Sequence, residues 1–363
     1  MNAPATRRLH ELGQRIWLDN LSRDLLASGT LAGWIRDLDV TGVTSNPSIF
    51  DRAIRQTDLY DEPIRRLARA GLSDEEIFFA LVLADLRDAA ELFRPAFKAS
   101  GGADGWVSLE VSPSLAADTA GTIAQAKALH ARAALPNLFI KIPATPEGIP
   151  AIEECVFSGV PINVTLLFTA EQYLASAEAW RRGVERRLAA GLTAPVRSVA
   201  SLFVSRWDKA VEGRVPEALR NRLGIAVAER TYRAYREWLA RPEVRRLAEA
   251  GMPPQRLLWA STGTKDPQAS DVLYVEALVA PETINTVPDA TLLAFADHGR
   301  VGPVLPEDGG EAEDVLARFA AAGIDIAEIA ARLLREGVAT FEKAWRDMMS
   351  RIVAKQEGVS RVD

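Results

Sequence analysis

Apolar residues gather along the chain in short runs, which are separated by longer stretches with a helical pattern. The runs are rich in β-branched and aromatic residues and lack a clean alternation of polar and apolar positions, which is typical of strands buried on both faces of a parallel sheet. We therefore predict eight strands: Arg15–Asp19, Gly42–Ser45, Gly105–Val111, Leu138–Ile142, Pro161–Thr165, Ser198–Val204, Leu257–Ser261 and Thr283–Val287.

The stretches between the runs predict helices with recognisable starts and stops. One covers residues 114–133, with Ser114 as its N-terminal cap, and another starts at Thr169 and stops at Gly191. In "SNPSIF", Asn46 is a candidate cap and Pro47 occupies the first helical position.

Eight strands that alternate with helices predict an α/β fold, a closed (β/α)8 TIM barrel over about residues 12–300. An open doubly wound sheet is the alternative, although no GxGxxG follows any predicted strand. Residues 207–255 and 311–358 exceed a minimal barrel and have helical patterns. We expect both to pack over the outer wall, the second as a C-terminal helical extension of a single domain, 1–363.

Composition narrows the class of protein. The chain is 48% hydrophobic and 25% charged with a net charge of -6, as in ordinary soluble globular proteins. Scattered basic residues argue against nucleic acid or an anionic membrane as partner. The only cysteine, Cys155, indicates a reducing compartment, and neither a signal-peptide core in the first 18 residues nor a membrane-length apolar run is visible. We expect a cytoplasmic protein.

One lysine lies where lysines are rarely found. Of the seven lysines, Lys141 alone falls within a predicted strand, in "NLFIKIPAT". Removing an ammonium group from water is costly, so this position needs an explanation. The side chain could reach the barrel rim or pair with a buried carboxylate. Alternatively it is a nucleophilic amine that forms a Schiff base with a carbonyl group.

Polar residues that could assist such an amine lie in or at the ends of other predicted strands: Asp19, Asn46, Glu110, Asn163 and Thr165. Several have structural alternatives, because Asp19 could cap a helix near Leu21, Asn46 could cap its own helix and Thr165 could be an ordinary strand residue. Glu110 needs a partner, because it lies between Leu109 and Val111 in a buried strand.

Five segments, in order, resemble signature segments of the transaldolase family, within the class I Schiff-base aldolases: "TGVTSNPSIF", "VSLEVSP", "NLFIKIPAT", "PINVTLLF" and "SLFVSRWD". The resemblance runs from Asp19 to about Pro288. The length of the chain, "LLWASTGTKDP" and the helical C-terminal extension are similar to a longer bacterial branch of that family.

The resemblance implies four catalytic roles. Lys141 corresponds to the Schiff-base lysine, and Asp19 to the general acid/base that handles the sugar hydroxyl proton. Glu110 and Thr165 correspond to the pair that positions a catalytic water.

It also implies binding roles. Asn46 and Asn163 match residues that hydrogen-bond the dihydroxyacetone unit, and Ser201 and Arg206 match phosphate-binding residues. Lys265 stands where many members have a second phosphate-binding arginine. A lysine holds phosphate as a point charge without the bidentate fork of arginine, and a solvated loop residue is the alternative for Lys265.

The implied function is that of a transaldolase of the non-oxidative pentose phosphate pathway. It would transfer dihydroxyacetone from sedoheptulose 7-phosphate or fructose 6-phosphate to glyceraldehyde 3-phosphate or erythrose 4-phosphate, as a monomer or homodimer. No metal or organic cofactor is expected, and His10, His130 and His298 are far apart in sequence. The alternatives are a fructose 6-phosphate aldolase that releases free dihydroxyacetone and a non-catalytic sugar-phosphate binding barrel.

Overall fold

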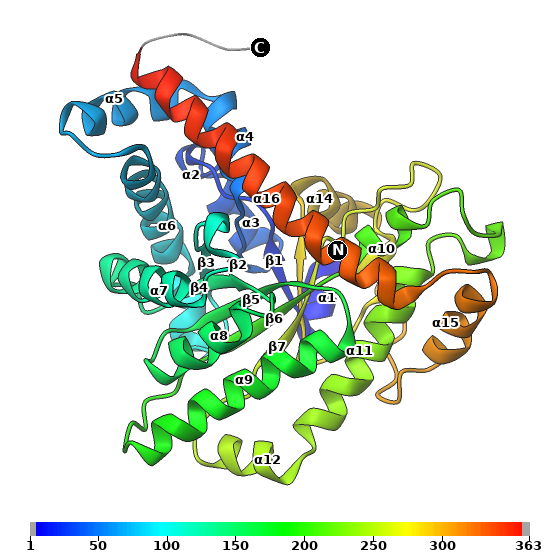
Figure 1. Cartoon of the computed structure of the whole chain (residues 1–363). Coiled ribbons are helices and arrows are strands. Elements are labelled where there is room, and N and C mark those ends of the chain that lie inside the picture. Colours follow the sequence, from blue (N-terminus) through cyan, green and yellow to red (C-terminus); the bar gives the residue numbers. More distant parts are fainter. Residues whose placement is uncertain (1–4, 358–363) are drawn as a thin grey trace.

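Parallel strands close into a barrel at the centre of the molecule (Figure 1). The structure is a computed structural model that describes residues 5–357, and within them eight strands follow one another around the barrel in chain order. β1 pairs with both β2 and β8, which closes the sheet and rules out the open alternative. The strands are β1 (Arg15–Leu18), β2 (Val40–Val43), β3 (Trp106–Glu110), β4 (Leu138–Pro143), β5 (Ile162–Leu167), β6 (Ser198–Phe203), β7 (Arg256–Ala260) and β8 (Ile284–Val287).

Helices surround the barrel (Figure 1). None of the helices within residues 5–357 is long and apolar enough to cross a membrane. They are α1 (Ala5–Glu11), α2 (Arg23–Ala27), α3 (Thr30–Asp37), α4 (Pro47–Gln56), α5 (Asp61–Arg69), α6 (Asp74–Ala99), α7 (Thr119–Ala133), α8 (Gly148–Phe157), α9 (Ala170–Ala189), α10 (Ser205–Ala210), α11 (Leu223–Leu239), α12 (Pro242–Glu249), α13 (Leu273–Ala277), α14 (Asp289–His298), α15 (Ala312–Ala321) and α16 (Ile326–Gln356), with 3-10 turns η1 (Asp58–Tyr60), η2 (Pro113–Leu115) and η3 (Glu217–Leu219).

The second strand begins two residues earlier than predicted. β2 ends at Val43, so the predicted strand Gly42–Ser45 was wrong at both ends. A Cβ on Gly42 would lie 2.7 Å from the indole of Trp17, so this glycine makes room for that ring in the barrel interior. Thr44 and Ser45 therefore follow the strand at the carboxyl end of the barrel, where TIM-barrel active sites lie.

Two predicted helix starts are confirmed. The Asn46 side chain accepts a hydrogen bond from the backbone N–H of Ile49 at 3.1 Å, and Pro47 is the first residue of α4. Thr169 caps α9 in the same way, and the helix ends just before Gly191, whose φ is +75°.

The predicted cap at Ser114 is wrong. Ser114 lies in η2, and its Oγ is 2.7 Å from that of Ser112. Helix α7 begins five residues later, after Asp118, whose carboxylate accepts a hydrogen bond from the N–H of Gly121. Pro113 starts the short 3-10 turn, and an aspartate caps a helix N-terminus as well as a serine does.

The two predicted helical additions differ in position. Within residues 207–255, α11 packs against α9 and β7 on the outer wall, as expected. In the second addition, residues 311–358, α15 packs against α11. Helix α16 does not cover the wall, so that part of the prediction is wrong. It packs against α4, α10, η2 and β5, which follow or form the carboxyl ends of their strands. Residue 358, the expected end of the extension, lies outside the described residues.

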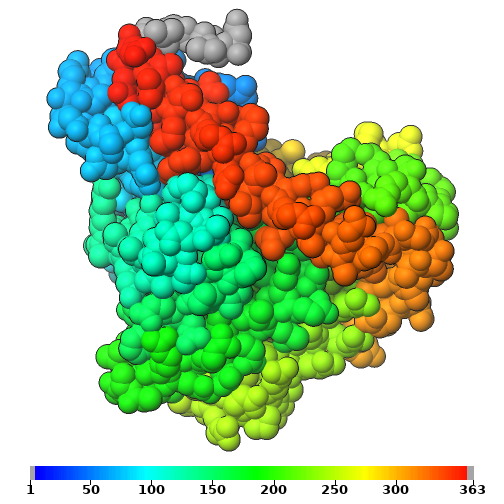
Figure 2. Space-filling model, in the orientation of Figure 1, coloured from blue at the N-terminus to red at the C-terminus, as the bar shows by residue number. Residues whose placement is uncertain are grey.

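Figure 2 shows α16 as the orange-to-red band that crosses one face of the molecule. Its far end lies beside α5 (Figure 1), against which it packs together with α6. The amphipathic pattern of α16 shows that one of its faces is buried, but the pattern does not tell which surface covers that face.

Candidate active site

Lys141 lies in β4 directly opposite Glu110 of β3 in the barrel ladder. Its Nζ is 3.3 Å from Glu110 Oε2 and donates a hydrogen bond to the backbone carbonyl of Ser45 at 3.1 Å. Lys141 is 4% exposed. The buried carboxylate that Lys141 could require is therefore present, and the same amine also lines a cavity.

The Glu110 carboxyl group shares this burial. Loss of hydration raises the pKa of Glu110, and the nearby Lys141 ammonium opposes that rise. The sequence indicated that Glu110 needs a partner in its buried strand, and Lys141 is that partner. A carboxyl group with a raised pKa beside an amine is suited to exchange protons at that amine.

Asp19 follows β1 at the same end of the barrel. Thr44 Oγ1 donates a hydrogen bond to Asp19 Oδ1 at 2.8 Å and is 2.6 Å from Thr286 Oγ1. Desolvation raises the pKa of Asp19, and the charge of Lys141 and the Thr44 hydrogen bond oppose it. Asp19 does not cap the next helix, because Ser22 caps α2.

A cavity at this end of the barrel brings six of the predicted site residues together. Its wall includes side chains that lie in or follow six of the strands, with Phe341 from α16: Asp19, Thr44, Asn46, Lys141, Ser201, Phe203, Arg206, Lys265, Thr286 and Phe341. Glu110, Asn163 and Thr165 do not line it and lie behind this wall in the barrel.

Asn163 connects the buried layer to the cavity wall. Its side-chain amide donates to Ser108 Oγ at 3.2 Å, and its Oδ1 accepts a hydrogen bond from Ser201 Oγ at 2.7 Å. Thr165 is fully buried, and its hydroxyl has no hydrogen-bond partner among the described residues. A buried hydroxyl without a partner is a natural position for a bound water.

Two cations lie at the cavity on separate elements. The Arg206 guanidinium, on α10, lies 4.9 Å from the ring centroid of Phe203 and 6.0 Å from that of Phe341, and burial lowers its pKa. Lys265, on the loop after β7, is exposed, and its charge opposes the rise in the pKa of Asp19. Positive charge at this wall suits an anionic substrate group.

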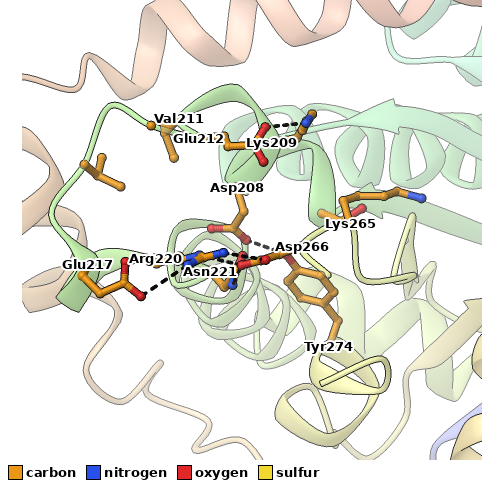
Figure 3. A pocket seen from close by; sticks show the side chains of 13 residues that line it. Asp208, Lys209, Val211, Glu212, Glu217, Arg220, Asn221, Lys265, Asp266 and Tyr274 are labelled. Atoms are coloured by element: carbon orange, nitrogen blue, oxygen red, sulfur yellow. Dashed lines mark hydrogen bonds and ion pairs between the residues drawn. The ribbon is translucent and has the colours of Figure 1, made fainter. Parts of the chain in front are cut away.

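A second cavity, drawn in Figure 3, shares Lys265 with the first. The Asp208 carboxylate accepts hydrogen bonds from the N–H groups of Leu223 and Gly224 and from the hydroxyl of Tyr274. Burial raises the pKa of Asp208 to about 6. This carboxylate fixes α10, which carries Arg206, to the start of α11.

The loops on either side of this second cavity are also joined. Arg220 binds Asp266 through two hydrogen bonds of 2.6 Å, and this pairing, with Asn221, lowers the pKa of Asp266 to about 2. Figure 3 shows Lys265 extending away from that pair. The ion pair thus anchors Asp266, the residue next to Lys265, while the Lys265 side chain takes no part in it.

Sequence reasoning missed several residues of this site. Thr44 and Phe203 lie within segments already singled out. Thr44 is two residues before Asn46 and Phe203 is three before Arg206, and this proximity could have suggested them. Phe341 lies in α16, about 200 residues beyond Lys141, and no local pattern connects the two. Only the packing of α16 over the strand ends brings Phe341 to the cavity.

Comparison with known proteins decides the family. The family model described as Transaldolase/Fructose-6-phosphate aldolase matches residues 16–352. The chain belongs to this family. Members from other organisms are similar to it over nearly their whole length.

Three curated relatives illustrate this similarity, and each is named Transaldolase. One from Parafrankia sp. (strain EAN1pec) is 46% identical over 353 residues, which cover 95% of this chain and 96% of the relative. One from Thiobacillus denitrificans is 45% identical, with 96% and 99% covered. One from Neisseria gonorrhoeae is 44% identical, with 94% and 97% covered. The match to the transaldolase/fructose-6-phosphate aldolase family thus includes the strands that carry the cavity and most of α16.

Proposed function

We propose that the protein is a transaldolase that works through a Schiff base on Lys141. The observation that carries this proposal is the buried Lys141–Glu110 pair with Asp19 in the adjoining cavity. Full-length similarity to proteins named Transaldolase supports it. Ketose and aldose phosphates are the substrates, as the cations Arg206 and Lys265 at the cavity suggest.

The reaction begins at the Lys141 amine. It attacks the C2 carbonyl of fructose 6-phosphate or sedoheptulose 7-phosphate, and loss of water gives an iminium ion that acts as an electron sink. Asp19 takes the proton of the C4 hydroxyl while the C3–C4 bond breaks, and an aldose phosphate leaves. The three-carbon enamine stays on Lys141 and adds to the aldehyde of a second aldose phosphate.

The surrounding residues position the reacting groups. Glu110 and the unpartnered hydroxyl of Thr165 hold the water that carries protons at the iminium. Asn46 and Asn163 hydrogen-bond the dihydroxyacetone unit. Ser201 lines the cavity and assists Arg206 in binding the phosphate, and its hydroxyl donates a hydrogen bond to Asn163 Oδ1.

Arg206 and Lys265 supply the positive charge that binds the substrate phosphate. Arg206, fixed against two aromatic rings, binds the substrate phosphate, and Lys265 adds a second charge from the opposite loop. The chemistry is covalent catalysis with a proton relay, so it requires neither a metal nor an organic cofactor. Such an enzyme serves the pentose phosphate pathway in the cytoplasm, a reducing compartment that suits its single cysteine.

A transfer assay tests the proposal. Purified protein is incubated with fructose 6-phosphate and erythrose 4-phosphate, and sedoheptulose 7-phosphate is measured, with Lys141→Ala as the inactive comparison. We expect the wild-type protein to form sedoheptulose 7-phosphate and the variant to form none. Release of free dihydroxyacetone in place of any transfer would assign the aldolase activity instead, and equal turnover by the variant would refute the role of Lys141.

A further inference from the structure

Phe341 brings an aromatic ring from the C-terminal helix to the reacting amine. Its ring centroid lies 5.8 Å from Lys141 Nζ and 6.0 Å from Arg206 Cζ, and the residue is 4% exposed. It lines the same cavity as Lys141 and Asp19. The ring therefore lies close to both the amine and the guanidinium at the carboxyl end of the barrel.

The helix that carries Phe341 is fixed on both sides of it. Toward its start, Ile329 and Leu333 belong to a buried cluster that includes Trp207 and Phe319. Toward its end, Arg351 forms an ion pair of 3.0 Å with Asp51 of α4. Further contacts at that end join Lys355 to Asp61 of α5 and Gln356 to Asp74 of α6.

A glycine one turn before Phe341 sets how closely the helix approaches. A Cβ on Gly337 would lie 2.8 Å from Leu166 Cδ2 and 3.3 Å from an Arg206 nitrogen. Leu166 lies in β5 directly after Thr165, with a left-handed φ of 57° at an irregularity of the strand pairing. The missing side chain lets α16 lie against the strand end, and Phe341 is thereby placed over the cavity.

We propose that Phe341 is a specificity-determining residue that keeps water from the covalent intermediate on Lys141 and so favours transfer over release of free dihydroxyacetone. This inference rests on the proposed function. An apolar ring has no proton to donate and no hydrogen-bonding group to hold a water near the enamine.

The two outcomes differ in one bond. In transfer, C3 of the enamine forms a bond to the aldehyde carbon of the acceptor, whose oxygen takes a proton, and hydrolysis of the iminium then frees the new ketose. In release, C3 takes a proton from water instead, a water oxygen adds to C2, and the C2–N bond breaks to return dihydroxyacetone and the free amine. From the enamine onward each route takes up one water, which balances the water lost when the iminium formed. The protonation of C3 is the step that a water above Lys141 would accelerate.

The test measures how the intermediate divides between these routes. Wild-type protein and Phe341→Ala are incubated with fructose 6-phosphate and erythrose 4-phosphate, and free dihydroxyacetone is counted per sedoheptulose 7-phosphate formed. We expect the ratio to rise about tenfold in Phe341→Ala, which corresponds to a relative barrier change of about 1.4 kcal/mol. Phe341→Leu, which keeps an apolar cover, is expected to stay closer to wild type.

A matched control lies on the same helix. Met348 is fully buried two turns beyond Phe341 and does not line the cavity. Met348→Ala removes a buried side chain of α16, so it reports the effect of a loosened helix alone. We expect its product ratio to equal that of the wild-type protein.

The outcomes separate this inference from the proposed function. Folded Phe341→Ala with the wild-type ratio, or an equal rise in Met348→Ala, would overturn the role of Phe341. If Phe341→Ala does not fold, Phe341→Gln, which places a polar amide over the amine, is measured in its place with the same expected rise. A wild-type protein that forms no sedoheptulose 7-phosphate would instead refute the transaldolase activity itself.

Discussion

Two carboxyl groups near the same amine have different surroundings. Glu110 lies behind the cavity wall against Lys141, whereas Asp19 lines the cavity and accepts a hydrogen bond from Thr44. Burial raises the pKa of both groups. Asp19 is thus positioned to exchange protons with a bound sugar, and Glu110 to exchange them near the nitrogen, which is the division that the proposed mechanism requires.

Thr44 offers a test of the role of Asp19 through pH. The Thr44 hydrogen bond favours the charged form of Asp19, so Thr44→Val is expected to raise the pKa of Asp19 further. In the proposed mechanism Asp19 acts as a base in its charged form. Activity is lost as pH falls through its pKa, so the acidic limb of kcat/KM should move to higher pH in the variant.

Thr44→Ser serves as the matched control, because it keeps the hydroxyl group and should leave the limb in its wild-type position. The measurement is kcat/KM for ketose cleavage as a function of pH in the three proteins. An acidic limb at the same pH in Thr44→Val and in the wild-type protein would mean that this hydrogen bond does not tune the catalytic base.

At the scale of elements, the closeness of α16 to β5 depends on Gly337. We expect Gly337→Ala to lower the free energy of unfolding by about 1–3 kcal/mol, because the added methyl group overpacks a filled contact with Leu166. The same methyl group would press on Arg206, so KM for sugar phosphates should rise as well. Denaturant unfolding and steady-state kinetics measure the two effects.

Thr340→Ala provides the control for this helix. Thr340 is exposed and bonds only to the carbonyl oxygen of Glu336, so we expect a stability change within about 0.5 kcal/mol and an unchanged KM. A Gly337→Ala protein with wild-type stability and KM would show that α16 can shift away from the barrel without consequence.

Sequence patterns were sufficient to predict the strands and two of the helix caps. Buried apolar runs identified all the strands of the closed barrel in order, because a parallel barrel buries both faces of its strands. Local chemistry placed the caps at Asn46 and Thr169. It misplaced the one at Ser114, because several polar residues there could begin a helix and only the chain path selects Asp118.

The sequence predicted most residues of the candidate site as well. Six of the nine predicted residues line the cavity, and Glu110 pairs with Lys141, because consecutive strand ends in a barrel face the same opening. The contribution of α16 was not predictable. A single amphipathic helix carries no information about which distant surface covers its apolar face, so Phe341 became visible only in the folded chain.

In the molecule as a whole, the C-terminal helix packs against helices from the first third of the chain. Helix α16 packs against α4, α5 and α6, so residues 326–356 hold residues 47–99 together across the face that contains the cavity (Figure 1). Trp345 of α16 lies 4.9 Å from the ring of Phe78 in α6. The cover of the site is therefore part of the packed structure and not a loose terminal segment.

Hydrogen exchange tests this description. We expect the amides of residues 341–352 to exchange more slowly than those of the loop 301–311, because burial and ion pairs hold that part of the helix. Replacing Arg351 and Lys355 together by alanine should accelerate exchange in α16 and leave the barrel strands unchanged. Exchange of α16 at loop rates in the wild-type protein would contradict its role as a fixed cover.

Trapping the covalent intermediate tests the role of Lys141 without relying on product analysis. Wild-type protein is reduced with borohydride in the presence of fructose 6-phosphate, digested, and its peptides are mapped by mass. We expect a three-carbon adduct on the peptide that carries Lys141. The imine should also form in Asp19→Ala, because that variant keeps the amine. A folded wild-type protein with no adduct, or with the adduct on another lysine, would contradict the assignment of Lys141 as the catalytic nucleophile.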